Sequence, residues 1–185
     1  MSDWRQSTLK IASDGFSLAG YPLLEFDRRP LDPFPLRGFA LAWNADLTLI
    51  QVLDSDFFRL NGYAVFRNSD VMRWRSFPKA DFVVRAVRLQ RVRPSKPHAV
   101  TIGSMREALR SAGAAFSLIT IHRERVRRGV CYVGKFLRTN QRAMAIKAIS
   151  PQALWEGEES YSLSEITLLE FGGEYEKLLQ RMAKW

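Results

Sequence analysis

The sequence predicts a mainly β protein (α+β) made of two tandem five-stranded units with short flanking helices. Residues 22–54 share their pattern of apolar and polar positions with residues 118–150 without a gap, and residues 70–74 share theirs with residues 165–169. A repeat at about ninety-five residues indicates a duplicated domain, because the units of solenoid proteins are shorter. Each copy contains short apolar runs separated by turn-forming residues, which is typical of a small antiparallel barrel or sandwich.

The first copy holds five strand-length segments, expected at residues 21–27, 39–43, 47–53, 63–67 and 71–75. A proline-rich connection follows the first segment, and the turn-forming sequence Asn44-Ala45-Asp46 separates the second from the third. Asn61-Gly62 is a hairpin-type dipeptide and should form the turn before the fourth. Residues 78–90 change to helical spacing, with apolar positions at Phe82, Val83, Ala86, Val87 and Leu89.

The second copy begins with a helix predicted at residues 101–111, with Ser104 or Thr101 as its N-cap and Gly113 just beyond its end. Strands are expected at residues 116–124, 130–137, 142–149, 161–163 and 166–171. Gly172-Gly173 then leads into a short helix at residues 174–184.

These elements predict a first small barrel with its C-terminal helix at residues 1–90 and a linker at 91–100. The second barrel, with helices at both ends, takes residues 101–185. Two prolines and several basic residues mark the linker. Domains of about 80 residues bury little surface, so we expect the two units to pack on each other or on another chain.

The net charge of +9 is unevenly distributed. Between Arg85 and Arg142 there are fourteen Lys or Arg and two acidic residues, whereas between Ala148 and Glu176 there are seven Glu and no Lys or Arg. Such a field can steer an anionic partner, and it equally allows acidic and basic faces to pair within the molecule or between copies.

The chain is expected to be cytoplasmic and not membrane-bound. It has no apolar run of the roughly 18 residues that a spanning helix needs, and no stretch of signal-peptide type follows Met1–Gln6. Its one cysteine, Cys131, rules out an internal disulfide and sits in an apolar run, where it should be a small buried hydrophobe.

No catalytic, metal or cofactor site is expected, and the chain is predicted not to be an enzyme. His98 and His122 are far apart in sequence, and no Cys or His cluster has metal-ligand spacing. There is no P-loop or dinucleotide fingerprint. The carboxylate pair Asp54/Asp56 lies in a probable loop, and no nucleophile-elbow sequence surrounds a serine near His122.

The first candidate binding group is basic. Arg123, Arg125 and Arg127 alternate, so on a strand they would share one face, with Arg128 at its end. Guanidinium groups match phosphate geometry well. The alternative is an exposed hairpin whose arginines pair with acidic residues of the same copy, namely Glu156, Glu158 and Glu159.

The second candidate group combines charge with aromatic rings. Arg73 and Arg75 flank Trp74, a combination that single-strand binders use, but Trp74 aligns with Leu169 of the other copy and is therefore equally a core residue. Trp155 lies in the acidic loop, where it is either a protein-contact anchor or a cap on the barrel.

Five short bent strands with a glycine in the second, Gly38 in one copy and Gly134 in the other, resemble the Sm-like (Sm, LSm and Hfq) small barrel. An SH3-like barrel fits nearly as well. Sm-type RNA sites use an Asn early in strand three and an Arg-Gly pair near the turn from strand four to strand five. At the first position the chain has Thr48 and Met144, and the nearest match to the second is Arg67-Asn68. The resemblance therefore implies the fold and assembly through strand edges, and weakly opposes uridine binding.

The function expected from these features is that of a non-catalytic binding or assembly protein whose partner is another protein or a second copy. The alternative is an RNA- or DNA-binding protein that uses the basic central region.

Overall fold

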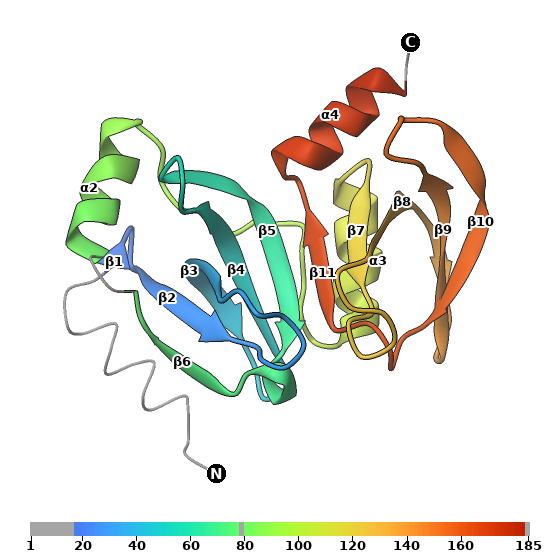
Figure 1. The fold of residues 1–185 in the computed structure, drawn as a ribbon, viewed down its shortest axis with the longest axis horizontal. Helices are drawn as coiled ribbons and strands as arrows, with labels where there is room; N and C mark the ends of the chain where they lie inside the picture. The colour runs from blue at the N-terminus through green and yellow to red at the C-terminus, as the bar shows by residue number, and fades with distance from the viewer. Residues whose placement is uncertain (1–16, 78–79, 184–185) are drawn as a thin grey trace.

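A computed structural model of the chain describes residues 17–77 and 80–183 and shows a mainly β protein (Figure 1). Within these residues, 11 strands form one antiparallel sheet, in the order β1-β2-β3-β4-β5-β11-β7-β8-β9-β10, with β6 pairing β2. None of the helices in the described ranges has the length and apolar character needed to span a bilayer. The N-terminal sequence Met1–Gln6, and Pro78 and Lys184 at the ends of two expected helices, lie outside the described residues.

The first repeat contains every strand expected for it. Its elements are β1 (Ser17–Leu18), β2 (Tyr21–Asp27), β3 (Leu36–Trp43), β4 (Leu47–Asp54), β5 (Arg59–Arg67), the single 3₁₀ turn η1 (Asn68–Asp70), β6 (Arg73–Ser76) and α2 (Ala80–Leu89). The predicted turn at Asn61-Gly62 is wrong, because both residues lie inside β5. Gly62 has a φ of 69°, and a Cβ there would lie 2.5 Å from the backbone nitrogen of Gly173, so this glycine marks a close backbone approach.

The second repeat contains α3 (Met105–Ala115), β7 (Ile119–His122), β8 (Cys131–Thr139), β9 (Ala143–Ile149), β10 (Trp155–Ser162), β11 (Leu168–Phe171) and α4 (Glu174–Met182). Ser104 is the N-cap of α3 and accepts a hydrogen bond from the backbone N–H of Glu107. Gly113 lies within α3 rather than beyond its end, and the side chain of Phe136 packs where a Cβ at this position would be.

The duplication is visible in matching backbone contacts. Gly38 pairs with Val52, and Gly134 pairs with Ala148. A Cβ on Gly38 would stand 2.3 Å from a carbonyl oxygen of β4, and one on Gly134 would stand 2.5 Å from the equivalent oxygen of β9. Two strands therefore cross at the same short distance in both repeats, where only glycine fits.

The expected alignment of the first strands needs a correction by one residue. Leu24 faces Gly38, and Ile119 faces Gly134, so Leu24 corresponds to Ile119 instead of Thr120. The glycines sit opposite a buried side chain of the neighbouring strand, and a slip of one residue would turn that side chain to the other face.

Each repeat is a four-stranded meander whose fifth strand returns to the first. β6 pairs with β2 in the first repeat, and β11 pairs with β7 in the second. Among the described residues β5 does not pair with β6, nor β10 with β11, so neither repeat closes by strand pairing. Instead β11 pairs antiparallel with β5 of the other repeat and joins the two into one sheet.

One apolar core extends through both repeats. It includes Leu23 and Phe39 of the first repeat and Ile119 and Ile146 of the second. α2 and α3 both contribute to it, α2 through Ala80, Val83, Val84 and Val87. The predicted apolar face of α2 was partly wrong, because Phe82 and Leu89 are exposed.

Candidate interaction site

The edge strand β6 presents a basic face to solvent. Arg73 and Arg75 are exposed, and the side chain between them, Trp74, is half-buried against the apolar cluster that contains Phe26 and Phe66. Strand alternation explains this arrangement, because successive side chains point to opposite faces. Of the two interpretations of Trp74, the structure supports the core residue. Its indole packs on the apolar cluster, on the face of β6 opposite to Arg73 and Arg75.

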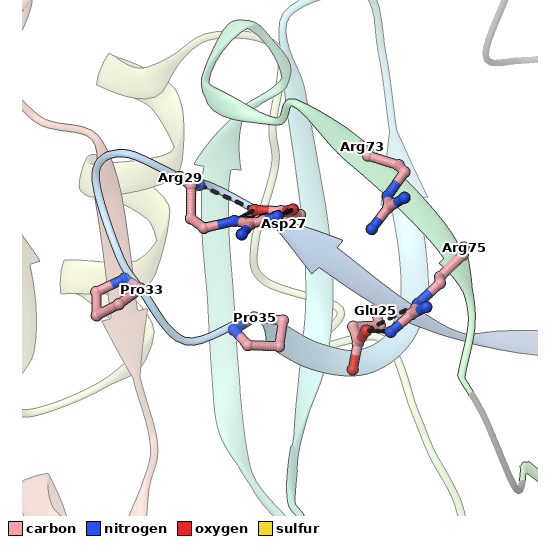
Figure 2. Close-up of a pocket in the computed structure, with 7 residues that line it drawn as sticks. All are labelled: Glu25, Asp27, Arg29, Pro33, Pro35, Arg73 and Arg75. Atoms are coloured by element: carbon pink, nitrogen blue, oxygen red, sulfur yellow. Dashed lines mark hydrogen bonds and ion pairs between the residues drawn. The ribbon is translucent and has the colours of Figure 1, made fainter.

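A surface pocket of about 190 Å³ lies beside β6 (Figure 2). It is lined by residues of β2, β6 and the loop after β2, namely Glu25, Asp27, Arg29, Pro33, Pro35, Arg73 and Arg75. Three arginines and two carboxylates share this small volume, so the pocket carries a positive charge.

Most charges in this pocket are already paired. Glu25 accepts hydrogen bonds from Arg37 at 2.8 Å and from Arg75 at 2.9 and 2.6 Å. Burial favours the neutral form of Glu25, but the two arginines together outweigh it and hold its pKa below the ordinary value. Arg29 donates to Asp27 at 2.9 and 2.6 Å, and this pairing lowers the pKa of Asp27 to about 2.

Arg73 is different from its neighbours. Within residues 17–77 and 80–183 its guanidinium has no hydrogen bond and no ion pair, and Figure 2 shows it extending from β6 beside the pocket. A guanidinium presents five donors. The pocket therefore has one cation at the outer edge of the sheet that acts on Asp27 only through space and makes no direct contact with a carboxylate.

The opposite end of the sheet is acidic. β10 pairs only with β9 in the described part of the chain, and its residues from Trp155 to Ser160 are exposed. The prediction of an acidic loop here is wrong, because Glu156, Glu158 and Glu159 belong to this strand. Trp155 is 42% exposed, and the ammonium of Lys147 lies 5.2 Å from its ring centroid, so it is a surface side chain rather than a barrel cap.

The three alternating arginines do not share a strand face. β7 ends at His122, and residues 123–127 form a turn in which the N–H groups of Val126 and Arg127 both donate to the carbonyl of Arg123. Arg123 donates to Glu165, with one bond of 3.0 Å, and Arg125 pairs with Asp70. Neither uses the acidic partners expected from the sequence. Arg127 and Arg128 remain exposed.

This turn instead forms part of a buried polar contact between the repeats. Arg28, 1% exposed, donates through both terminal nitrogens to Glu124, with one bond of 3.1 Å. Arg67 donates to the carbonyls of Ile166 at 2.9 Å and Leu163 at 2.7 Å. Burial raises the pKa of Asp70, although Arg125 opposes this. These side chains join the two repeats where the C-terminal end of β5 lies beside the N-terminal end of β11, so their role here is structural.

A cross-strand group of reactive residue types was not expected from the sequence. Cys131 pairs with His122 across β8 and β7, and the Nε2 of His122 lies 2.7 Å from Glu170. Cys131 is exposed, so the prediction of a buried cysteine is wrong. No hydrogen bond joins the thiol to His122 among the described residues. Although the residue as a whole is exposed, partial desolvation of the thiol by its neighbours, together with Glu170, raises the pKa of Cys131. The arrangement therefore opposes formation of a thiolate nucleophile.

Within the described ranges, no group of three or more His, Cys, Asp or Glu side chains could hold a metal ion. The sequence named Arg73, Arg75 and Trp155 but did not place them on edge strands. The signals that could have done so were the cluster of glutamates at residues 156–159 and the position of residues 73–76 as the fifth strand of the first repeat.

Comparison of the chain with protein-family models, with curated proteins and with solved structures gave no match.

Proposed function

We propose that this chain is a non-catalytic assembly protein, built from two tandem Sm-like or SH3-like small barrels, that binds protein partners through the edges of its sheet. The observation that carries the proposal is the antiparallel pairing of β5 with β11, which joins the two repeats by their edges. Backbone pairing at an exposed edge is a general way for one chain to bind another.

The free edges support this function. β6 pairs only with β2, and β10 only with β9, so within the described residues each leaves one side without a strand partner. Natural sheets usually protect long edges by a covering segment, a bulge or inward charges. The charged side chains of β6 and β10 lie on exposed faces. At such positions they favour a partner strand of opposite charge and disfavour one of like charge.

The catalytic alternative has no comparable support. Cys131 has a raised pKa and no hydrogen bond to His122, as described above. The nucleic-acid alternative is also weaker than the sequence suggests, because Arg123 and Arg125 are engaged by Glu165 and Asp70.

Sedimentation of the purified chain over a range of micromolar concentrations tests the proposal. We expect an average mass that rises with concentration and falls with added salt, because charged edges contribute to the contact. A chain that stays monomeric at every concentration and every salt level would contradict the assembly function. Anisotropy with labelled RNA and DNA pools serves as the counter-test, and tight salt-dependent binding there would favour the nucleic-acid alternative.

A further inference from the structure

We propose that the partner is a second copy of this chain, and that β10 of one copy pairs antiparallel with β6 of the next. This inference rests on the assembly function proposed above. It adds the identity of the two edges, their register and the charges that select them.

The template for this contact lies inside the chain. β5 and β11 pair with Phe66 opposite Leu168, Val65 opposite Leu169 and Ala64 opposite Glu170. β5 is the fourth strand of its repeat, and β11 is the fifth strand of the other. The corresponding fourth and fifth strands that remain are β10 and β6, and each pairs with one strand alone among the described residues. The two-residue β1 also has a free side, but it has no counterpart in the second repeat.

The register follows from the repeat. Val65 faces Leu49 of β4, and Ser160 faces Ala145 of β9, at equivalent positions of the two meanders. Val65 therefore corresponds to Ser160. In the same way Phe171 of β11 faces Ile119, and Ser76 of β6 faces Leu24, so β11 and β6 correspond residue by residue.

Transferring the internal register to the free edges brings opposite charges together. Glu159 lies opposite Arg75 of the next copy, Ser160 opposite Trp74, and Tyr161 opposite Arg73. Glu159 is then also the diagonal neighbour of Arg73, within reach of long side chains in a sheet. Arg73, which makes no hydrogen bond or ion pair within the described residues, thus meets a carboxylate.

The two edges cannot meet within one molecule of this structure. β6 and β10 lie at opposite ends of the sheet, with eight strands between them along the hydrogen-bonded path, and Figure 1 shows them at opposite sides of the molecule. The contact is therefore head-to-tail. Head-to-tail contacts generate a ring if the rotation closes and a filament if it does not.

Disulfide trapping tests the register. In a Cys131→Ser background, the Glu159→Cys/Arg75→Cys chain should form a ladder of covalent multimers under mild oxidation. The control is Glu156→Cys/Arg75→Cys, which has the same number of thiols but places one of them in the stretch of β10 between Trp155 and Glu158 where the register shifts, outside the regular pairing. We expect trapping on the order of tenfold faster for the first pair. Equal rates, with the mass still rising with concentration, would overturn this inference and leave the assembly function standing, whereas a chain that is monomeric throughout would remove both.

Charge reversal provides a second test that needs no oxidation. Arg73→Glu and Glu159→Lys should each weaken self-association about tenfold. The two changes in one chain should recover part of that loss, because the diagonal pair is restored with its charges exchanged while Arg75 still lies opposite position 159. Arg73 is suitable because its guanidinium makes no hydrogen bond or ion pair among the described residues and acts on Asp27 only through space, whereas Glu159 accepts a hydrogen bond from the hydroxyl of Tyr161. Arg106→Glu on α3, an exposed position remote from both edges, makes the same charge change and should have no effect. Failure of the double variant to recover, with both single variants folded, would count against the pairing.

Discussion

Glu124 receives both terminal nitrogens of Arg28 from a residue 96 positions earlier in the chain, and both side chains are buried. Arg28 follows β2 of the first repeat, and Glu124 lies in the turn after β7 of the second. The ion pair therefore spans the boundary between the repeats, beside the strands that join them.

Removing one partner of this pair should destabilise the protein strongly. Arg28→Met leaves the carboxylate of Glu124 buried without its cation, which costs about 3–5 kcal/mol in comparable cases. The Arg28→Met/Glu124→Leu chain replaces both charges with apolar groups and should recover most of that loss. Urea unfolding of the three proteins measures the difference. If the double variant is no more stable than Arg28→Met, the loss does not come from leaving Glu124 unpaired. The ion pair itself would then stabilise the contact between the two repeats.

The glycine crossings predict matched effects in the two repeats. Gly38→Ala and Gly134→Ala each place a Cβ against a backbone oxygen, at 2.3 and 2.5 Å, and should lower the free energy of unfolding by about 1–3 kcal/mol. Gly157→Ala on β10 meets no atom within 4 Å and is the control. Thermal unfolding checks all three, and a tolerated Gly38→Ala would mean that β3 and β4 can separate at no cost.

The turn after β7 contains arginines of unequal importance. Arg125→Ala removes the partner of Asp70, whose side chain is 2% exposed, and should cost about 1–3 kcal/mol of stability. Arg127→Ala changes an exposed side chain and should stay within about 0.5 kcal/mol. Chemical denaturation of the two variants compares them. Equal effects would contradict a structural role for the contact between Arg125 and Asp70.

Asp27 predicts a pH dependence at the acidic end. Its hydrogen bonds from Arg29 lower its pKa from 3.8 to about 2, so its contribution to stability is present above pH 3.8 and is lost as the pH falls through about 2. Asp27→Asn lacks this contribution. The difference in unfolding free energy between the two proteins should thus be constant near neutral pH and should shrink between about pH 4 and pH 2. A difference independent of pH would rule out the ionised pair as its source.

Much of the fold could be predicted because strand alternation and turn residues are local patterns, and because the duplication repeats them about ninety-five residues later. The strands of the first repeat, the helix after it and Ser104 as an N-cap all follow from spacing and turn residues. Asn61-Gly62 misled because tertiary contact with Gly173 places a turn-type dipeptide inside a strand. The length of β10 was missed because its exposed glutamates show no apolar alternation.

The candidate site could be predicted only in part. Arg73 and Arg75 are exposed, and Trp155 is exposed in agreement with one of its two interpretations. The shared face of Arg123, Arg125 and Arg127, however, required β7 to continue past His122. The strand stops where Glu124 turns inward to Arg28, a long-range ion pair that no local pattern encodes. The sequence alone could not show that Glu124 pairs with Arg28, so it could not show where β7 ends.

The joint between β5 and β11 also determines how the molecule responds to dilution. Because both strands belong to one polypeptide, their encounter is intramolecular and its equilibrium does not depend on protein concentration. The two repeats therefore stay joined at concentrations at which separate subunits would come apart. Any larger assembly of this chain therefore gains the two described repeats together, already joined in one sheet.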